Sequence, residues 1–162
     1  MKKGRSRAGI IAIVIFTLGF LSVCPLFGQM GATPTPMNSQ SSGSITISGY
    51  WARMALQVGG VSAAYMEIRS AEQADTLVRA ESPVAKVVEL HETTMREGLM
   101  AMSPVAKMTV PAKGEVLVLK PAGLHLMLID LKSPLKAGDV FGLDLYFDRT
   151  GKITLNVPVL AP

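Results

Sequence analysis

The chain has 162 residues, which is enough for one domain with a sizeable hydrophobic core and an appended segment. Its formal net charge is +4, but residues 1–29 hold four of the sixteen Lys and Arg side chains and no acid, so the remainder carries twelve charges of each sign. Because this part of the chain is close to neutral, its composition gives no reason to expect nucleic acid or anionic lipid as a partner.

The N-terminal segment has the pattern of an export signal. The basic stretch "MKKGRSR" precedes the apolar run "AGIIAIVIFTLGFLSV". Cys24 also suits a lipoprotein signal, although Val23 is bulkier than the Gly, Ala or Ser that lipidation favours. Ala8 to Phe27 is an uncharged stretch of 20 residues, long enough for an uncleaved anchor. We therefore expect a signal peptide or N-terminal membrane anchor over residues 1–29, and a periplasmic or otherwise extracytoplasmic domain.

Cysteine chemistry is absent from the rest of the sequence. Cys24 is the only cysteine, so the chain beyond residue 29 has no thiol and forms no internal disulfide. In an oxidising compartment thiolates are readily lost to disulfides, so a soft-metal site there gains from ligands that cannot couple in this way.

Residues 30–44, "MGATPTPMNSQSSGS", are rich in Pro, Ser, Thr and Gly and have no apolar period. This composition predicts a flexible linker, followed by one folded domain over residues 45–162.

From residue 44 onward, short segments rich in β-forming residues alternate apolar and polar side chains and are separated by turn residues. They cover residues 44–54, 61–70, 75–82, 84–92, 114–121, 124–131, 141–148 and 152–160. Helical turns are considered only at 70–76 and 96–107. Tyr50 and Trp51 are expected to anchor the first strand in the core. The spacing predicts an all-β sandwich of about seven or eight strands.

The two histidines of the chain both lie near methionines. Residues i and i+2 of a strand project from the same face, so His125 and Met127 form a pair of donors on one side of their strand. The leucines on either side of them are expected to point the other way, into the core.

His91 ends another predicted strand, and a loop containing Gly98 returns the chain to Met102. If these loops lie at one end of the sandwich, His91, Met102, His125 and Met127 meet. Neutral imidazole and thioether donors suit Cu(I) better than zinc, calcium or magnesium. A blue-copper centre is excluded because it needs a cysteine ligand.

This arrangement resembles the metal-binding signature of the periplasmic PCuAC copper chaperones. His91 is followed by ten residues and Met102, then by twenty-two residues and His125, one residue and Met127. The similarity also covers "GYWARM", "SPVAKVVELHETTMREGLMAM" and "LKPAGLHLMLIDLKSPLKAGD". It implies a cupredoxin-like Greek-key β-sandwich that binds one Cu(I) at those four residues. It also implies copper delivery to cuproenzymes, chiefly the CuA centre of cytochrome c oxidase, or to another chaperone.

Other interpretations remain open from the sequence. Copper sequestration for tolerance, without a dedicated recipient, has the same donors, and a metal-free β-sandwich scaffold has the same strand pattern. Met100 is an alternative ligand to Met102. Packing, or a surface thioether for incoming copper, is the other role considered for Met100 and Met95. No catalytic motif is recognisable, so we do not expect an enzyme.

Overall fold

A computed structural model describes residues 38–96 and 98–161, and these ranges consist of strands, turns and bends. The segment expected to be a signal or anchor, and residues 30–37 of the expected linker, lie outside the described residues. In the described ranges no helix is long and apolar enough to cross a membrane. The strands are β1 (Ser39–Ser42), β2 (Ile45–Arg53), β3 (Val61–Ser70), β4 (Asp75–Glu81), β5 (Ala85–Arg96), β6 (Leu99–Pro104), β7 (Met108–Val110), β8 (Val116–Leu119), β9 (Leu124–Leu131), β10 (Val140–Phe147) and β11 (Gly151–Leu160).

All eight strands expected from the sequence are present, and three further short strands bring the number in the described ranges to eleven. Residues 39–42 were expected to belong to the flexible linker, but they pair with β2 and form the strand β1. The helical turns considered at 70–76 and 96–107 are wrong: the first range holds bends between two strands, and the second contains β6.

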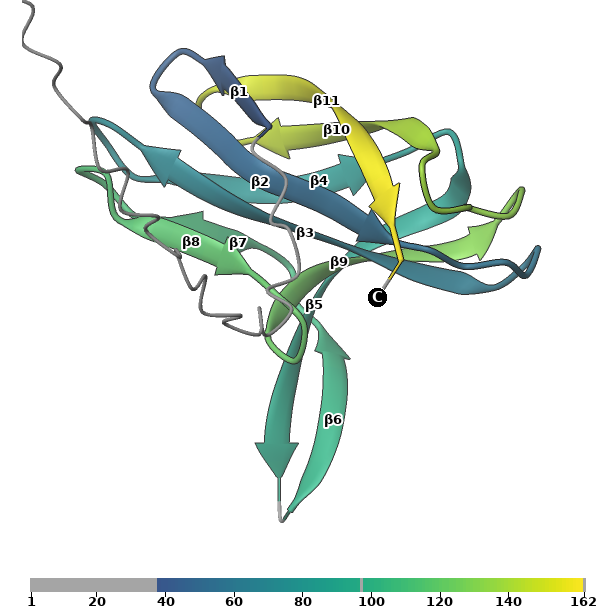
Figure 1. The fold of residues 1–162 in the computed structure, drawn as a ribbon. Helices are drawn as coiled ribbons and strands as arrows, with labels where there is room; N and C mark the ends of the chain where they lie inside the picture. The colour runs from purple at the N-terminus through teal and green to yellow at the C-terminus, as the bar shows by residue number, and fades with distance from the viewer. Residues whose placement is uncertain (1–37, 97, 162) are drawn as a thin grey trace, which may run out of the picture. The chain divides into compact units, whose positions relative to one another are not determined.

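The strands form two layers of a sandwich (Figure 1). One layer has the order β6-β5-β9-β3-β2, with β1 paired to β2 and β8 to β3, and the other has the order β11-β10-β4-β7. A short parallel pairing of β11 with β2, at Val159 and Leu160, joins the layers at one edge. The all-β sandwich predicted from the alternation is confirmed.

The inner faces of the two layers form the core. On β9, Leu126 and Leu128 are fully buried, as expected, and Leu143 and Leu145 of β10 belong to the same core cluster. Burying such side chains stabilises the fold by about 1.5–3 kcal/mol each, so the backbone of β9 is firmly anchored. Side chains on the outer face of β9 therefore have well-defined positions.

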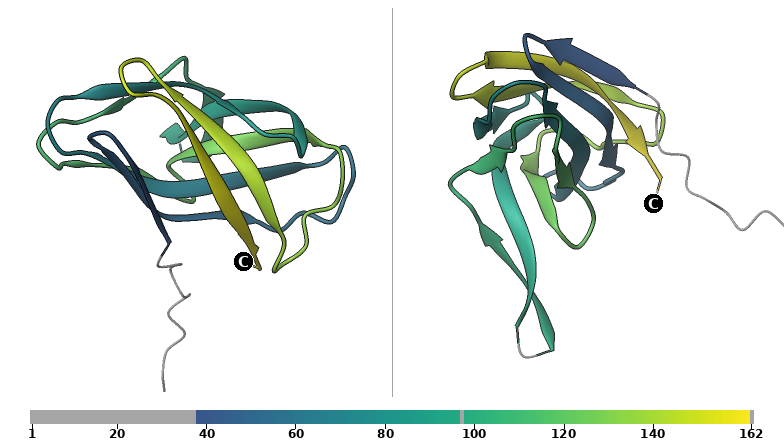
Figure 2. Two further views of the ribbon diagram at one scale, coloured as in Figure 1. Left: turned by 90° about the horizontal axis from the view of Figure 1, so that it is seen from above. Right: turned by 90° about the vertical axis from the view of Figure 1, so that its left-hand side faces the viewer.

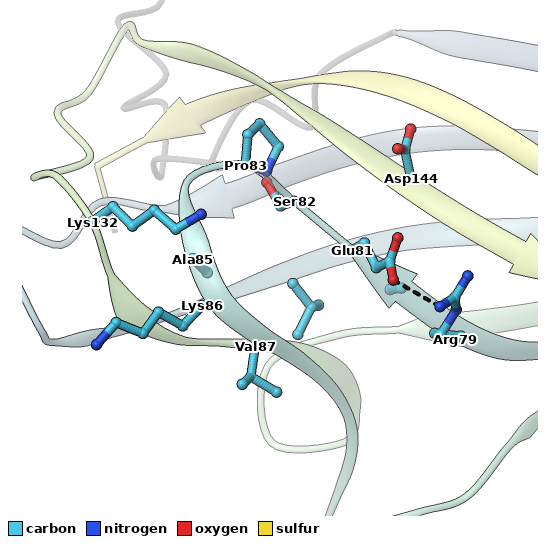
Figure 3. Close-up of a pocket in the computed structure, with 11 residues that line it drawn as sticks. Arg79, Glu81, Ser82, Pro83, Ala85, Lys86, Val87, Lys132 and Asp144 are labelled. Atoms are coloured by element: carbon cyan, nitrogen blue, oxygen red, sulfur yellow. Dashed lines mark ion pairs between the residues drawn. The ribbon is translucent and has the colours of Figure 1, made fainter.

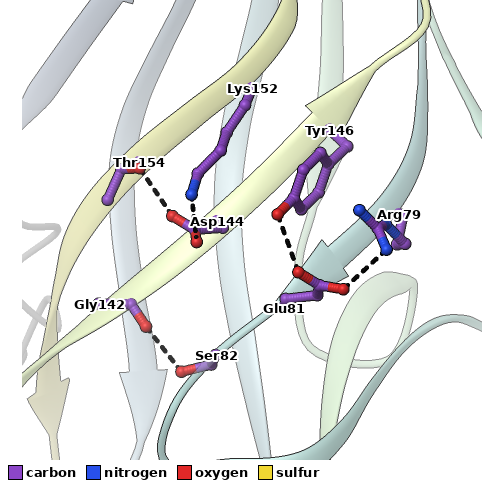
Figure 4. Close-up of polar contacts among 8 residues, drawn as sticks. All are labelled: Arg79, Glu81, Ser82, Gly142, Asp144, Tyr146, Lys152 and Thr154. Atoms are coloured by element: carbon purple, nitrogen blue, oxygen red, sulfur yellow. Dashed lines mark hydrogen bonds and ion pairs between the residues drawn. The ribbon is translucent and has the colours of Figure 1, made fainter.

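The outer face of the second layer is polar (Figure 4). The Asp144 carboxylate accepts a hydrogen bond from Thr154 and pairs with Lys152 at 2.8 Å, while the Tyr146 hydroxyl donates to Glu81. These contacts join neighbouring strands in a solvated setting, where each is worth little individually. They show that this face is an ordinary charged exterior.

The β5–β6 hairpin extends beyond the rest of the sandwich (Figures 1 and 2). β5 pairs with β9 through residues 85–92, and its distal part pairs only with β6. Gly98 in the tight turn has φ of +80°, a conformation that favours glycine. This hairpin replaces the loop that was expected after His91.

Candidate metal centre

The two histidines lie side by side on the outer face of the first layer. His91 of β5 and His125 of β9 are direct cross-strand partners, and their ring centroids are 5.8 Å apart at an interplanar angle of 50°. Because a metal–imidazole bond is about 2 Å long, rings at this separation are close enough to share one ion. Both side chains are covered, with exposed fractions of 8% and 5%.

A backbone hydrogen bond sets the orientation of the His125 ring. Its Nδ1 lies 2.9 Å from the carbonyl oxygen of Gly123. A carbonyl oxygen only accepts, so Nδ1 carries the proton and the neutral ring keeps a free lone pair on Nε2. Metal-binding histidines are oriented in this way by a hydrogen bond from the other ring nitrogen.

His91 is oriented by a carboxylate. Its Nε2 lies 2.8 Å from Oε2 of Glu89, two residues earlier on the same face of β5. A carboxylate accepts a hydrogen bond from Nε2–H, so Nδ1 of the neutral ring is left as an acceptor. That Nδ1 atom is buried and has no hydrogen-bond partner. An unpartnered buried acceptor costs about 1–3 kcal/mol, a cost that a bound cation removes.

The two methionines of the motif share this face. Met127 lies two residues beyond His125 on β9 and is the cross-strand partner of Glu89. Met102 of β6 is the partner of Thr93, which lies two residues beyond His91 on β5. Cross-strand partners, and residues two apart, project from one side of a sheet. All four expected ligands therefore lie on one face, over three adjacent strands.

The methionines and His125 line a groove of about 490 Å³ on this face. Thr93 and Tyr65 line the same groove, and so does Met100. The four expected ligands thus lie on the outer face of a sheet and a projecting hairpin. The expectation that they meet in loops at one end of the sandwich is wrong.

Three further residues shape the centre without having been expected there. Glu89 orients His91, and its signal in the sequence is the two-residue spacing in "ELH". Tyr65 lies beside His125 with ring centroids 6.5 Å apart, and Trp51 packs on Tyr65 at 4.7 Å. The prediction that Trp51 lies in the core is wrong, since it belongs to this outer aromatic row; Tyr50 is buried in the core as expected.

A second hollow, of about 690 Å³, lies between β4 and β5 and has a different character (Figure 3). Its charged groups include Arg79, which pairs with Glu81, and Lys86, which pairs with Asp130. Its lining contains no histidine, methionine or cysteine. In residues 38–96 and 98–161, no three or more His, Cys, Asp or Glu side chains are grouped so as to hold a metal ion. His125 and the two methionines of the motif instead line the first groove.

The donor set determines what the centre binds best. Two neutral imidazoles and two thioethers bring no negative charge to the ion itself. The carboxylate of Glu89 does not contact the ion site directly, since it is hydrogen-bonded to the other nitrogen of the His91 ring. Soft, neutral donors favour a monovalent soft cation over hard divalent ions, which prefer oxygen.

Comparison with known sequences places the chain in a family. The sequence model of the family described as "Putative lipoprotein LpqE-like" matches residues 45–159. "Putative lipoprotein Lxx21020" of Leifsonia xyli subsp. xyli is 31% identical over 141 residues, covering 83% of each chain. "Uncharacterized protein RP573" of Rickettsia prowazekii is 31% identical over 113 residues, covering 67% of this chain and 62% of that protein.

Comparison with solved structures agrees with this assignment. The copper-bound PCuAC domain from PmoF2 has a TM-score of 0.66 at 22% identity, covering 78% of this chain and all of that domain. The solution structure of CuI-DR1885 from Deinococcus radiodurans has a TM-score of 0.54 at 32% identity, covering 68% of this chain and 76% of that one. PCuAC domains are cupredoxin-like β-sandwiches, so the predicted fold class is confirmed. The chain therefore belongs to the LpqE-like, PCuAC-type family that its histidine and methionine spacing predicts.

Proposed function

We propose that this domain is an extracytoplasmic copper chaperone that binds one Cu(I) through His91, Met102, His125 and Met127. The observation that carries the proposal is the buried histidine pair, in which Nδ1 of His91 has no partner and Nε2 of His125 keeps its lone pair. The similar structures of CuI-DR1885 and of the copper-bound PmoF2 domain support copper as the ion.

The arrangement suits a carrier rather than an enzyme. The imidazoles are held by Glu89 and Gly123 on anchored strands, so they provide a fixed base for the ion. Met102 is 62% exposed on the projecting hairpin, so it is the ligand that a partner's donor displaces first. Ligand exchange of this kind leaves copper as Cu(I), because a lone pair of the partner's donor replaces the lone pair of the Met102 sulfur and no electron is transferred.

We further propose that the acceptor is a cuproenzyme, such as the CuA centre of cytochrome c oxidase, or another copper chaperone. The N-terminal signal or anchor expected over residues 1–29 would keep the domain outside the cytoplasm, near membrane-bound acceptors. The family's description as lipoprotein-like supports a membrane tether.

Anaerobic titration with Cu(I), in competition with a chromophoric Cu(I) chelator, tests the first proposal. The full chain should bind one equivalent, and His125→Ala should weaken binding by roughly a hundredfold or more, as expected when a principal ligand is lost. Lys120→Ala, a change to an exposed side chain shortly before β9, is the control and should leave the affinity unchanged. A wild-type chain that fails to compete for Cu(I) would contradict the proposal.

Delivery is tested separately by mixing the Cu(I)-loaded chain with a copper-free CuA domain under anaerobic conditions. Delivery predicts that copper moves to the CuA domain faster than the chain releases it to buffer. Transfer no faster than spontaneous release would favour sequestration over delivery to that acceptor.

A further inference from the structure

The projecting hairpin carries exposed methionines, and their exposure cannot be explained by packing in the core. Met95 and Met100 are 67% and 60% exposed, close to the value for Met102. Methionine is ordinarily a core residue, and Met66 and Met108 of this chain are buried in that way. Exposed thioethers on a hairpin of a secreted domain therefore call for another explanation.

Met95 and Met100 face each other across the hairpin. They are direct cross-strand partners of β5 and β6, so their Cβ atoms are expected about 4.5–5.5 Å apart on one face. Two flexible thioethers at this separation are able to bind one soft ion between them. Two such donors alone bind it more weakly than the four donors of the histidine centre.

The pair lies on the face that bears the metal centre. Met95 lies two residues beyond Thr93, and Met100 lies two residues before Met102, so the register places the three thioethers in sequence along one face. Met100 also lines the groove that contains Met102, His125 and Met127, whereas Met95 lies beyond its lining. Met100 is therefore the link between the exposed tip and the centre.

We infer that Met95 and Met100 form a second, weaker site for a soft monovalent cation, which takes up Cu(I) and passes it to the histidine centre. The inference rests on the proposed function, because it requires Cu(I) binding at His91, Met102, His125 and Met127. In the transfer, copper–sulfur bonds to Met95 and Met100 break as bonds to Met102 and then to the imidazoles form. Copper remains Cu(I), and no proton or electron changes place.

The kinetic test compares the wild-type full chain with a Met95→Leu/Met100→Leu double variant, which keeps the apolar shape and removes both sulfurs. Equilibrium affinity for the first Cu(I) should change by no more than about twofold, as for a change outside the four-residue centre. The rate of Cu(I) uptake from a chromophoric chelator, followed anaerobically by stopped flow, should fall roughly tenfold because the high local copper concentration is lost.

A matched control adds Leu99→Met to the double variant. Leu99 is the immediate neighbour of Met100 on β6 and therefore projects from the opposite face of the hairpin, so a thioether there should not restore the rate. Unchanged uptake by the double variant would overturn the inference while leaving the proposed function intact. A tenfold or greater loss of equilibrium affinity would also overturn it, since Met100 would then be a ligand of the main centre. A wild-type chain that takes up no Cu(I) overturns both proposals.

A second readout uses Ag(I), a soft monovalent ion with no redox chemistry under these conditions, and ¹³C-methyl labelled methionine. The signals of Met102 and Met127 should shift during the first equivalent, and those of Met95 and Met100 only during the second. Signals of Met95 and Met100 that never move would contradict the second site, whatever the behaviour of the first.

Discussion

At the scale of single residues, hydrogen bonds orient the two histidines that we propose as copper ligands. Glu89 and the carbonyl of Gly123 each accept a hydrogen bond from one nitrogen of an imidazole, so that the lone pair of the neutral ring lies on its other nitrogen. In its neutral form each ring thus presents one lone pair, and both rings are buried. Preorganisation of this kind lowers the cost of binding.

Glu89→Gln should weaken Cu(I) binding by about tenfold, the lower end of the range for residues that orient metal-bound histidines, because Glu89 is partly exposed. Glu92→Gln is the matched control, since Glu92 projects from the other side of β5. Chelator competition measures both affinities, and circular dichroism should show the same β fold in each variant. Equal affinities for the two variants would show that Glu89 does not orient the His91 ring.

Removing the thioether of Met127 or of Met102 should weaken Cu(I) binding by about tenfold for each, or about 1.4 kcal/mol. Leucine preserves the volume and removes only the sulfur, so Met127→Leu and Met102→Leu separate ligation from packing. Met54→Leu is the control, because Met54 lines the same groove outside the four-residue motif. If all three variants compete with the chelator as well as the wild type, thioether ligation is wrong.

The four residues of the motif could be proposed as copper ligands from the sequence because their spacing is specific, and the strand register places them on one face. Glu89 was not identified as part of the centre, because a carboxylate near a histidine is usually a solvated side chain. Its contact with His91 requires that the strand continue through "ELH", so that the two side chains lie on one face. β5 does continue through these residues in the structure, but the sequence alone is also compatible with a strand that ends at His91.

At the scale of elements, the hairpin of β5 and β6 is the part that the sequence did not reveal. Residues 93–102 lack the alternation of apolar and polar side chains that marks a half-buried strand, because the distal hairpin has no core to cover. Its strands are held by pairing with each other and by the glycine turn at Gly98. A segment with two exposed faces gives no hydrophobic period, so it was expected to be a loop.

Asp75 at the start of β4 fixes the turn between β10 and β11. Its buried carboxylate accepts hydrogen bonds from the Thr150 hydroxyl and from the backbone amides of Arg149, Thr76 and Thr150. Burial alone would raise the pKa of this carboxyl, but these four hydrogen bonds outweigh it and hold the pKa below its usual value. The ionised form therefore stabilises the fold above the usual carboxyl pKa, and this contribution disappears as the pH falls through the lowered value.

Asp75→Asn should lower the free energy of unfolding by about 1–3 kcal/mol at pH 7, because the new amide nitrogen cannot accept the bonds from Thr150. The difference in unfolding free energy between variant and wild type should narrow as the pH falls below about 4, where the unfolded wild-type chain binds a proton, and should disappear below the lowered pKa of the folded state. Urea denaturation of both proteins at pH 7 and pH 3 measures this difference in the free energy of unfolding. Asp148→Asn, an exposed neighbour in the same turn, should have little effect, and a pH-independent deficit in Asp75→Asn would contradict a role for the charge.

At the scale of the whole molecule, the sandwich could be predicted because its inner faces impose a period of two on eight segments. The sequence did not show which strands are neighbours, because pairing over long distances depends on side chains that meet only in the folded chain. His91 and His125 are thirty-four residues apart and become direct partners through the β5–β9 pairing. The sequence did not reveal β1, because it has four polar residues, or β7, because three residues are too few to show an alternation.

The two layers differ in the side chains on their outer faces. The layer of β10, β11 and β4 has a polar exterior of paired charges, whereas the layer of β9, β5 and β3 has soft donors on its outer face. The buried leucines of β9 hold the backbone beneath His125 and Met127 in place. The proposed copper site thus lies on one sheet face, with the hydrophobic core behind it.

X-ray absorption spectroscopy of the full chain loaded anaerobically with one equivalent of copper tests the central claim most directly. A Cu(I) ion bound by His91, Met102, His125 and Met127 should show the absorption edge of Cu(I) and a first shell of two nitrogen and two sulfur neighbours. The sulfur contribution should be halved in Met127→Leu, and the nitrogen contribution halved in His125→Ala. A first shell of nitrogen and oxygen without sulfur, or a spectrum unchanged by both substitutions, would contradict it.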